Sequence, residues 1–444
     1  MSEKTAENLG GAAEFKQGLL EDYALKPVPA QQRKSLYANL TTWSGWVISI
    51  SAFLVGGQVG KGLSVGRGFA AIILGNLFLA LVAGFIGNIG ARTGLSTTVA
   101  ARMVFGKKGS VLISLLLGII AMLFIGVLLG GFGQVMTALF PWLPAWAAIL
   151  VFTVLCTSSA IFGYRGLALL SMFAVPALWV LAIIAVLRGS AQVGGLAAVM
   201  DIVPKEQMSF WLATTLAIGT WITGASLSCD VARYCKSSRD VFLSSVISFI
   251  FGAGLFESAS LIVSLATGSG DLGIVFAKLG MLTFAVLTIG LALWTTTDNN
   301  IYSSALAFTN LGNLIGFQFP KWGWTLIAAG IALVGAAFNL VNVFRPWLVF
   351  LTVTMTPFAG VMLGHYYLTG FINKPYQEML HHTSAGFRWI AFAAWVVGIL
   401  VVKYYTKGLP AVQGMIASAV VYWILFRLFE PKAIVESPAA KEAG

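Results

Sequence analysis

Long apolar runs constrain the fold of this chain more than any other feature of its sequence. Runs of roughly 20 residues recur between residues 40 and 429, the length that an α-helix needs to cross about 30 Å of hydrocarbon. Membrane β-strands would instead show short alternating segments, so the continuous runs exclude a β-barrel. The runs fall near 40–60, 68–89, 110–136, 144–163, 166–187, 208–231, 241–267, 274–298, 322–341, 345–369, 386–403 and 410–429. The sequence therefore predicts an all-α integral membrane protein with about twelve transmembrane helices in one domain.

The charge distribution predicts how the chain lies in the membrane. Only 10% of the residues are charged, and the net charge of +11 gathers in the tails and in alternate loops. This bias follows the positive-inside rule, so it predicts a plasma (inner) membrane protein with both termini in the cytoplasm and no nucleic-acid partner. We expect mobile cytoplasmic tails at 1–35 and 431–444 around a membrane-spanning domain at 36–430. The first tail lacks the apolar core of a cleavable signal peptide.

A polar cluster at 291–302 lies at the end of one apolar run, where Thr295, Thr296 and Thr297 are followed by Asp298 and two asparagines. A charged side chain at membrane depth costs ~3 kcal/mol or more, and such groups usually face a pathway or a binding site. Hydroxyls and freed backbone carbonyls are the hard oxygen ligands that a small cation requires. The alternative is that the hydroxyls bond back to their own helix and Asp298 marks the helix end.

Glycines interrupt the first and the sixth apolar runs, at Gly56 and Gly57 and at Gly219 and Gly224. Glycine permits a helix to unwind and to expose backbone groups, and interrupted helices at corresponding positions of two halves indicate a transporter binding site. The alternative is that these glycines only allow neighbouring helices to approach closely. The pattern favours unwinding, with two five-helix units repeated in inverted topology.

Six segments carry a resemblance to a known family. They are 56–64 (GGQVGKGLS), 87–95 (GNIGARTGL), 101–110 (ARMVFGKKGS), 171–177 (SMFAVPA), 230–234 (DVARY) and 294–299 (WTTTDN). In order and spacing they resemble the nucleobase–cation symporter (purine-cytosine permease) family, above all the bacterial cytosine permeases, over roughly residues 35–430. The resemblance implies a leucine-transporter-type inverted repeat at about 36–190 and 205–370, with two accessory C-terminal helices at about 385–430.

The resemblance also implies which residues form the sites. A flat base would lie between Phe124 and Trp221, with backbone and hydroxyl contacts from Gly219 and Thr220, and Ala121 replaces a glutamine of cytosine permeases. Aromatic stacking contributes ~1–3 kcal/mol per base. A cation site would use oxygens from the residues Gly45, Ser49, Ala292, Thr295 and Thr296.

Two acidic residues are candidates for proton coupling. Glu257 lies in the seventh apolar run, at a position where the family comparison does not lead us to expect a carboxyl, and Asp298 lies in the polar cluster. An intramembrane carboxyl is by default a functional-site hypothesis. Alternatively, Glu257 pairs with a neighbour near one membrane interface.

The sequence as a whole predicts a secondary active symporter that imports a nucleobase such as cytosine with Na⁺ or H⁺. A purine, a hydroxymethylpyrimidine or a hydantoin-like heterocycle remains an alternative substrate. A channel is disfavoured because no ring of charges or filter repeat appears. An enzyme is disfavoured because no nucleophile–base arrangement is found, and Cys156, Cys229 and Cys235 lack metal-ligand spacing. We expect a monomer that requires the lipid bilayer and a coupling cation but no cofactor.

Overall fold

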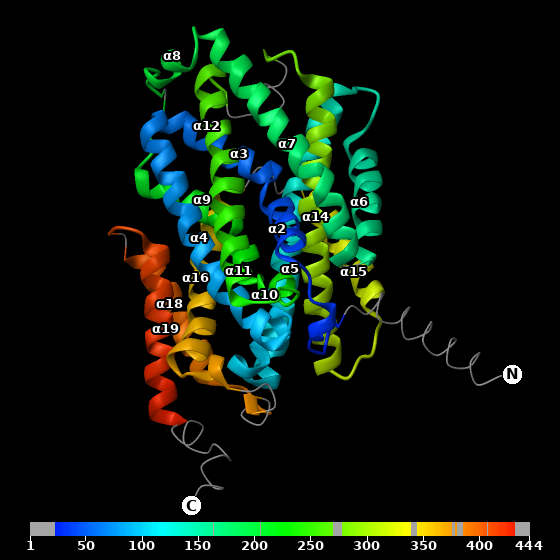
Figure 1. Ribbon diagram of the computed structural model, residues 1–444, viewed down its shortest axis with the longest axis vertical. Coiled ribbons are helices and arrows are strands. Elements are labelled where there is room, and N and C mark those ends of the chain that lie inside the picture. Colours follow the sequence, from blue (N-terminus) through cyan, green and yellow to red (C-terminus); the bar gives the residue numbers. More distant parts are fainter. Residues whose placement is uncertain are drawn as a thin grey trace, which may run out of the picture.

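The computed structural model describes residues 23–162, 164–204, 206–269, 278–338, 344–374, 378–379, 385–405 and 407–430. Figure 1 shows upright helices packed side by side, with α8 at one end of the molecule and the end of α19 at the other. The regular elements of the described residues are helices, as the apolar runs predict. The tail residues 1–22 and 431–444 and the loop histidines His381 and His382 fall outside the described residues.

The bounds of the helices follow the apolar runs closely. They are η1 (Ala30–Gln32), α2 (Leu36–Val47), α3 (Ile50–Gly62), α4 (Val65–Thr93), α5 (Thr97–Leu139), α6 (Ala145–Ile161), α7 (Tyr164–Gln192), α8 (Leu196–Met200), α9 (Phe210–Ser226), α10 (Cys229–Ala232), α11 (Ser238–Val246), the π-helix η2 (Ile247–Gly254), α12 (Leu255–Thr267), α14 (Leu282–Leu314), α15 (Lys321–Ala337), α16 (Phe344–Leu363), η4 (Gly364–Leu368), η5 (Phe371–Asn373), α18 (Trp389–Tyr404) and α19 (Pro410–Phe429).

Membrane-spanning length is clear for only part of this set. By length and composition, 6 helices of the described part can cross a membrane, or 7 if the bent pair α2 and α3 is one span. The apolar helices α6, α15 and α18 are shorter. The all-α membrane fold is thus confirmed, while the count of about twelve and the inverted repeat stay predictions.

The first and the sixth predicted spans are each interrupted in the structure. The helix α2 ends at Val47 and α3 begins at Ile50, with a bend of 51° across the break. The helix α9 ends at Ser226, and the short α10 begins at Cys229. The interruption of these two spans agrees with the prediction.

The positions of the breaks, however, correct the prediction about the glycines. Gly56 and Gly57 lie inside α3, and Gly219 and Gly224 lie inside α9, so none of them unwinds its helix. A Cβ atom on Gly56 would collide with the backbone carbonyl of Glu257 on α12. Gly56 therefore permits α3 to approach α12 closely, which is the packing alternative.

The helix α14 extends well beyond its predicted span. It continues to Leu314, so Asp298 does not mark a helix end and the polar cluster lies in mid-helix. Hydropathy underestimates α14 because its polar extension is buried against neighbouring helices rather than exposed to lipid. The element α5 consists of two helices joined at Gly106, whose φ of 76° and ψ of 164° are not helical, so the helix after Gly106 agrees with the predicted span at 110–136.

Residues 23–34 correct the prediction of a mobile N-terminal tail up to residue 35. Val28 N–H donates to the carbonyl of Gly94 at 3.0 Å, and Lys34 N–H donates to the carbonyl of Tyr234 at 2.7 Å. The Arg33 guanidinium donates to the carbonyl of Ala91 at 2.7 Å. This N-terminal strap, residues 23–34, is therefore fixed to the ends of α4 and α10.

Candidate functional site

Three buried aromatic rings meet where the two interrupted helices face α5. The Trp221 ring of α9 lies 6.3 Å from the Phe124 ring of α5 and 6.3 Å from the Trp46 ring of α2, measured between centroids. All three side chains are at most 3% exposed. The predicted pair Phe124 and Trp221 is therefore brought together, and Trp46 joins it. Sequence reasoning missed Trp46, although its place in the first interrupted span was a usable signal.

The rings do not form parallel walls. The planes of Phe124 and Trp221 are inclined by 66°, and those of Trp46 and Trp221 by 72°, so both contacts are edge-to-face. Edge-to-face packing is itself favourable for aromatic pairs. A flat base could enter between Phe124 and Trp221 only after at least one ring turns.

The aromatic cluster carries polar atoms without partners. The indole nitrogens of Trp46 and Trp221 are buried and make no hydrogen bond. The buried hydroxyls of Thr223 and Ser226, further along α9, also have no partner. Gly224 contributes no side chain here, and a Cβ on it would lie 3.1 Å from the Trp221 ring and 3.4 Å from the Trp46 ring. A buried donor or acceptor without a partner costs ~1–3 kcal/mol. The cluster therefore offers two N–H groups that a heterocycle could satisfy.

The remaining predicted substrate contacts have other partners in the structure. A Cβ on Gly219 would collide with the carbonyl of Leu348, so Gly219 allows α9 to pack against α16. The Thr220 hydroxyl donates to the carbonyl of Leu216 at 2.9 Å, which leaves its oxygen only as an acceptor. Ala121 is fully buried. Direct contact of these residues with a substrate stays a prediction.

Three predicted cation ligands, Ala292, Thr295 and Thr296, lie within two turns of α14. The Thr295 hydroxyl donates to the carbonyl of Ala292 at 3.0 Å, and the Thr296 hydroxyl has no partner although it is fully buried. The helix α14 packs against both α2 and α3, so it faces the break in the first span. A buried hydroxyl without a partner is an oxygen ligand of the kind that a hard cation requires.

The oxygens expected from the first span lie on either side of its break. Gly45 is in the last turn of α2, where backbone carbonyls run out of intrahelical partners. Ser49 caps α3: its carbonyl accepts from Phe53 N–H at 3.3 Å, and its hydroxyl lies 2.6 Å from that of Ser51. Ser49 is therefore already engaged within α3, whereas Gly45 fits the cation site better.

The two candidate proton-coupling carboxyls are both fully buried but lie in different places. Glu257 on α12 accepts one hydrogen bond, from the Asn76 side-chain amide of α4 at 2.8 Å. Asp298 faces α6, where the Ser159 hydroxyl donates to it at 3.0 Å and in turn accepts from the Trp294 indole at 2.9 Å. Glu257 is thus paired in the bundle interior rather than with a charged partner at a membrane interface.

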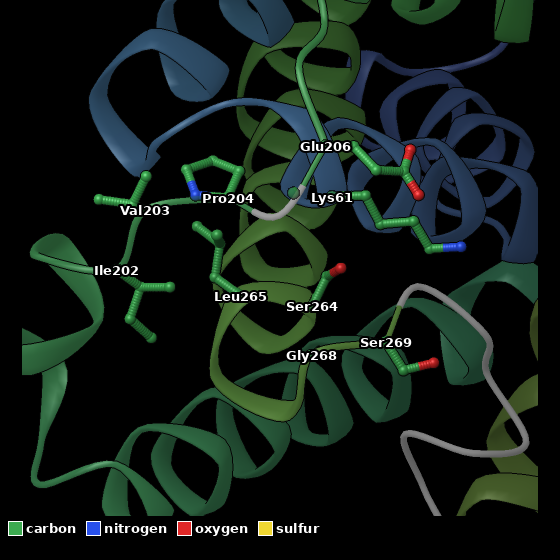
Figure 2. Close-up of a pocket in the computed structure, with 10 residues that line it drawn as sticks. Lys61, Ile202, Val203, Pro204, Glu206, Ser264, Leu265, Gly268 and Ser269 are labelled. Carbon is green, nitrogen blue, oxygen red and sulfur yellow. The ribbon is translucent and has the colours of Figure 1, made fainter.

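A separate pocket lies at the end of α3, and Figure 2 shows its lining. Its volume is about 280 Å³, and its walls come from the end of α3, the segment before α9 and the end of α12. Lys61, Glu206, Ser264 and Ser269 supply its polar groups. None of the aromatic cluster residues lines it, so this pocket is distinct from the aromatic cluster.

Comparison with known proteins identifies the class and then the family. A family model for permeases for cytosine/purines, uracil, thiamine and allantoin matches residues 27–425. The chain is 31% identical over 412 residues to the cytosine permease of Escherichia coli K12, covering 91% of this chain and 94% of that protein. The hydantoin permease of Microbacterium maritypicum is 24% identical over 433 residues, covering 88% and 86%. The chain is a membrane permease, and it belongs to this cytosine/purine permease family.

The fold agrees with a solved member of the same class. The structure of Mhp1, a nucleobase-cation-symport-1 family transporter, in a closed conformation with bromovinylhydantoin bound, superposes with a TM-score of 0.83. The match covers 94% of this chain and 98% of Mhp1 at 20% sequence identity. The resemblance inferred from the sequence motifs is thereby confirmed.

Proposed function

We propose that this chain is a symporter that imports a nucleobase such as cytosine across the plasma membrane together with Na⁺. The observation that carries the proposal is the aromatic cluster of Trp46, Trp221 and Phe124, which is buried and holds two indole N–H groups without partners. Cytosine is favoured as the substrate because the cytosine permease relative exceeds the hydantoin permease in identity.

The chemistry of this proposal follows from the groups present. The Trp221 face would stack on the base, which is worth ~1–3 kcal/mol. The indole N–H groups of Trp46 and Trp221 are donors only, so they would bind ring nitrogens or carbonyl oxygens of the base. The hydroxyls of Thr223 and Ser226 both donate and accept, so they suit a molecule with mixed edges such as a nucleobase.

The cation would couple to the base through the first interrupted helix. The oxygens of Ala292, Thr295 and Thr296 would hold Na⁺ against the end of α2 near Gly45, and α2 also carries Trp46. Filling the cation site would therefore fix the wall of the base site. By linkage, the base must then raise Na⁺ affinity by the same factor as Na⁺ raises base affinity.

The second candidate is a permease for a hydantoin-like heterocycle or a purine, driven by H⁺. A small apolar residue, Ala121, stands where cytosine permeases have glutamine, which removes one pair of groups that would read the base edge. Sites that hydrogen-bond a ligand discriminate more strongly than apolar pockets. Glu257 or Asp298 would carry the proton in this alternative, and both are fully buried.

The test is uptake of radiolabelled cytosine by cells that express the full chain, with unlabelled heterocycles as competitors. Saturable uptake that requires Na⁺ rather than K⁺ supports the proposal. Thr295→Val and Thr296→Val should abolish the Na⁺ dependence of base binding in purified protein. Thr309→Val on the same helix, whose hydroxyl donates to the carbonyl of Ala305, serves as the matched control and should keep it. Competition only by hydantoins, or chemical turnover of the base, would contradict the proposal.

A further inference from the structure

Glu257 and Asn76 form a side-chain pair that lacks one hydrogen-bond donor. Asn76 uses both amide protons: one goes to Glu257 Oε2 at 2.8 Å and the other to the carbonyl of Ile72 at 3.0 Å. Two acceptors of the same pair, Glu257 Oε1 and Asn76 Oδ1, are buried without a partner. An ionised carboxylate only accepts hydrogen bonds, whereas a protonated one also donates. One proton on Glu257 would therefore supply the donor that this pair lacks.

No charge compensates an ionised Glu257. Its side chain is fully buried, and among the described residues it forms hydrogen bonds to Asn76 alone and no ion pair. Burying an unpaired carboxylate costs far more than burying a neutral acid. The elements packed against α12 are α3, α4, α7, α8 and η2, and their titratable residues stand near helix ends. These residues are Lys61 on α3, Arg67 and Arg92 on α4, and Tyr164, Arg165 and Arg188 on α7.

A line of hydroxyls connects this pair with the pocket of Figure 2. Ser260 and Ser264 follow Glu257 at positions i+3 and i+7, so all three share one face of α12. That face meets α3, because Ser260 donates to the carbonyl of Phe53 at 2.5 Å and Ser264 donates to the carbonyl of Gly57 at 2.9 Å. Ser264 also lines the pocket, as Figure 2 shows. Glu257 and Ser264 are seven residues apart on α12, so Glu257 lies about 10 Å along the helix from the part of Ser264 that lines the pocket.

We propose that Glu257 and Asn76 form a proton-binding site that reports the position of α3. While α3 lies against α12, Glu257 is a neutral acid paired with Asn76. When α3 moves away, Ser260 and Ser264 lose their carbonyl partners and water from the pocket reaches Glu257. The Oε1–H bond then breaks, its electron pair stays on Oε1, and the proton passes to water. The inference adds a protonation site to the proposed transport function and depends on that function only for uptake measurements.

The experiment is infrared spectroscopy of the purified full chain at pH 7, comparing wild type with Glu257→Gln. The expected result is a carboxylic-acid carbonyl band in wild type that is lost in the variant. Glu206→Gln, which removes an exposed carboxyl at the pocket, should leave that band unchanged. A carboxylate signal in place of the acid band would overturn the proposal.

Thermal unfolding gives a second and independent measurement. Glutamine keeps the shape of glutamic acid and supplies an N–H donor for Asn76 Oδ1, so Glu257→Gln should match wild type at low pH. As pH rises above the usual pKa of glutamic acid, the unfolded wild-type chain releases this proton while the folded chain keeps it, so the Tm of wild type should fall relative to that of the variant. If the variant fails to fold, Asn76→Ala should instead shift the acid band toward an unbonded acid. Equal pH profiles of Tm for wild type and Glu257→Gln would overturn the proposal.

The sodium proposal can fail separately. Glu257→Gln should keep the Na⁺ dependence of base binding, because the oxygens of Thr295 and Thr296 are untouched. If base binding ignores Na⁺ while Glu257→Gln abolishes pH-dependent uptake, the driving ion is H⁺ and the protonation site stands. If binding requires Na⁺ and the acid band is absent, the transport proposal stands and the protonation site is wrong.

Discussion

The half-helices α3 and α10, which follow the breaks of the first and the sixth spans, are both held to a neighbouring helix by side-chain hydrogen bonds to backbone carbonyls. For α3 the carbonyls belong to the half-helix itself, whereas for α10 they belong to the neighbouring helix. In α3, glycines lie on the half-helix, and serines of α12 donate to its carbonyls at Phe53 and Gly57. In α10, the donors lie on or beside the half-helix: Ser228 and Cys229 each reach a carbonyl of α4 at 3.0 Å. The glycines now belong to α4, where a Cβ on Gly90 would lie 2.7 Å from Cys229. Small residues and side-chain bonds to backbone carbonyls thus clamp both half-helices.

The two clamps differ in the charged groups that reinforce them. At α10, Thr97 N–H donates to the Asp230 carboxylate at 2.8 Å, and the buried Arg233 donates to the Tyr302 hydroxyl at 2.6 Å and to the carbonyl of Tyr23 at 2.8 Å. At α3 the hydrogen bonds among the described residues are neutral: apart from the serine bonds, backbone N–H groups of the segment before α9 donate to the carbonyls of Lys61 and Gly62 at 3.1 Å each. We therefore expect α10 to be fixed more firmly than α3.

Arg233→Leu should give the largest effect, because it removes the charged reinforcement of α10. The substitution removes the donor to the Tyr302 hydroxyl and to the Tyr23 carbonyl of the N-terminal strap. Loss of the donor to a buried acceptor costs ~1–3 kcal/mol for each acceptor. Thermal unfolding in detergent should show a large fall in Tm, with Arg233→Lys intermediate. A Tm equal to that of wild type would remove the proposed difference between the two clamps.

Trp221→Ala compares the aromatic rings that precede the two breaks. The Trp221 ring contacts both Phe124 and Trp46, whereas within the described part of the chain the Trp46 ring contacts the Trp221 ring only. Loss of stacking at ~1–3 kcal/mol should weaken base binding by ~10-fold or more in Trp221→Ala. Trp46→Ala should weaken it less, and Trp221→Phe should retain much of it. Isothermal titration of purified protein with the base measures this order, and unchanged binding in Trp221→Ala would place the site elsewhere.

Gly56→Ala tests the closeness of α3 and α12 with the smallest change. The added methyl group would meet the carbonyl of Glu257, and such overpacking typically costs ~1–3 kcal/mol. The matched control is Gly66→Ala on α4, where a Cβ meets nothing within 4 Å. Gly56→Ala should lower Tm and the control should not, since alanine also favours helix more than glycine does. An equal Tm for both variants would show that α3 can shift away from α12 without a loss of stability.

Much of the architecture was readable from the sequence because it follows from local composition. The apolar runs predicted helices, the motifs predicted the family, and the first and sixth spans were correctly expected to be interrupted. The prediction placed the breaks at the wrong residues because it interpreted glycine as a residue that breaks a helix. In the structure, Gly56 and Gly219 serve contacts with carbonyls of distant helices, and those contacts leave no local sequence pattern.

The candidate site likewise combines residues that the sequence predicted with contacts that only the packing of the helices produced. Phe124 and Trp221 were predicted from the resemblance. That Trp46 belongs to the same cluster follows only from the packing of α2 against α9, which brings its ring to Trp221. The sequence presented Glu257 as a single buried carboxyl. Its partner Asn76, 181 residues away, was invisible until α4 lay beside α12.

The sequence by itself determined the membrane class, the helical content and the family, because apolar length and motif order act along the chain. Only the tertiary structure decided where the two helices break, that residues 23–34 form a strap, and which oxygens and rings face one another. Those features depend on pairs of residues far apart in sequence, whose contact energies exist only after the helices have packed.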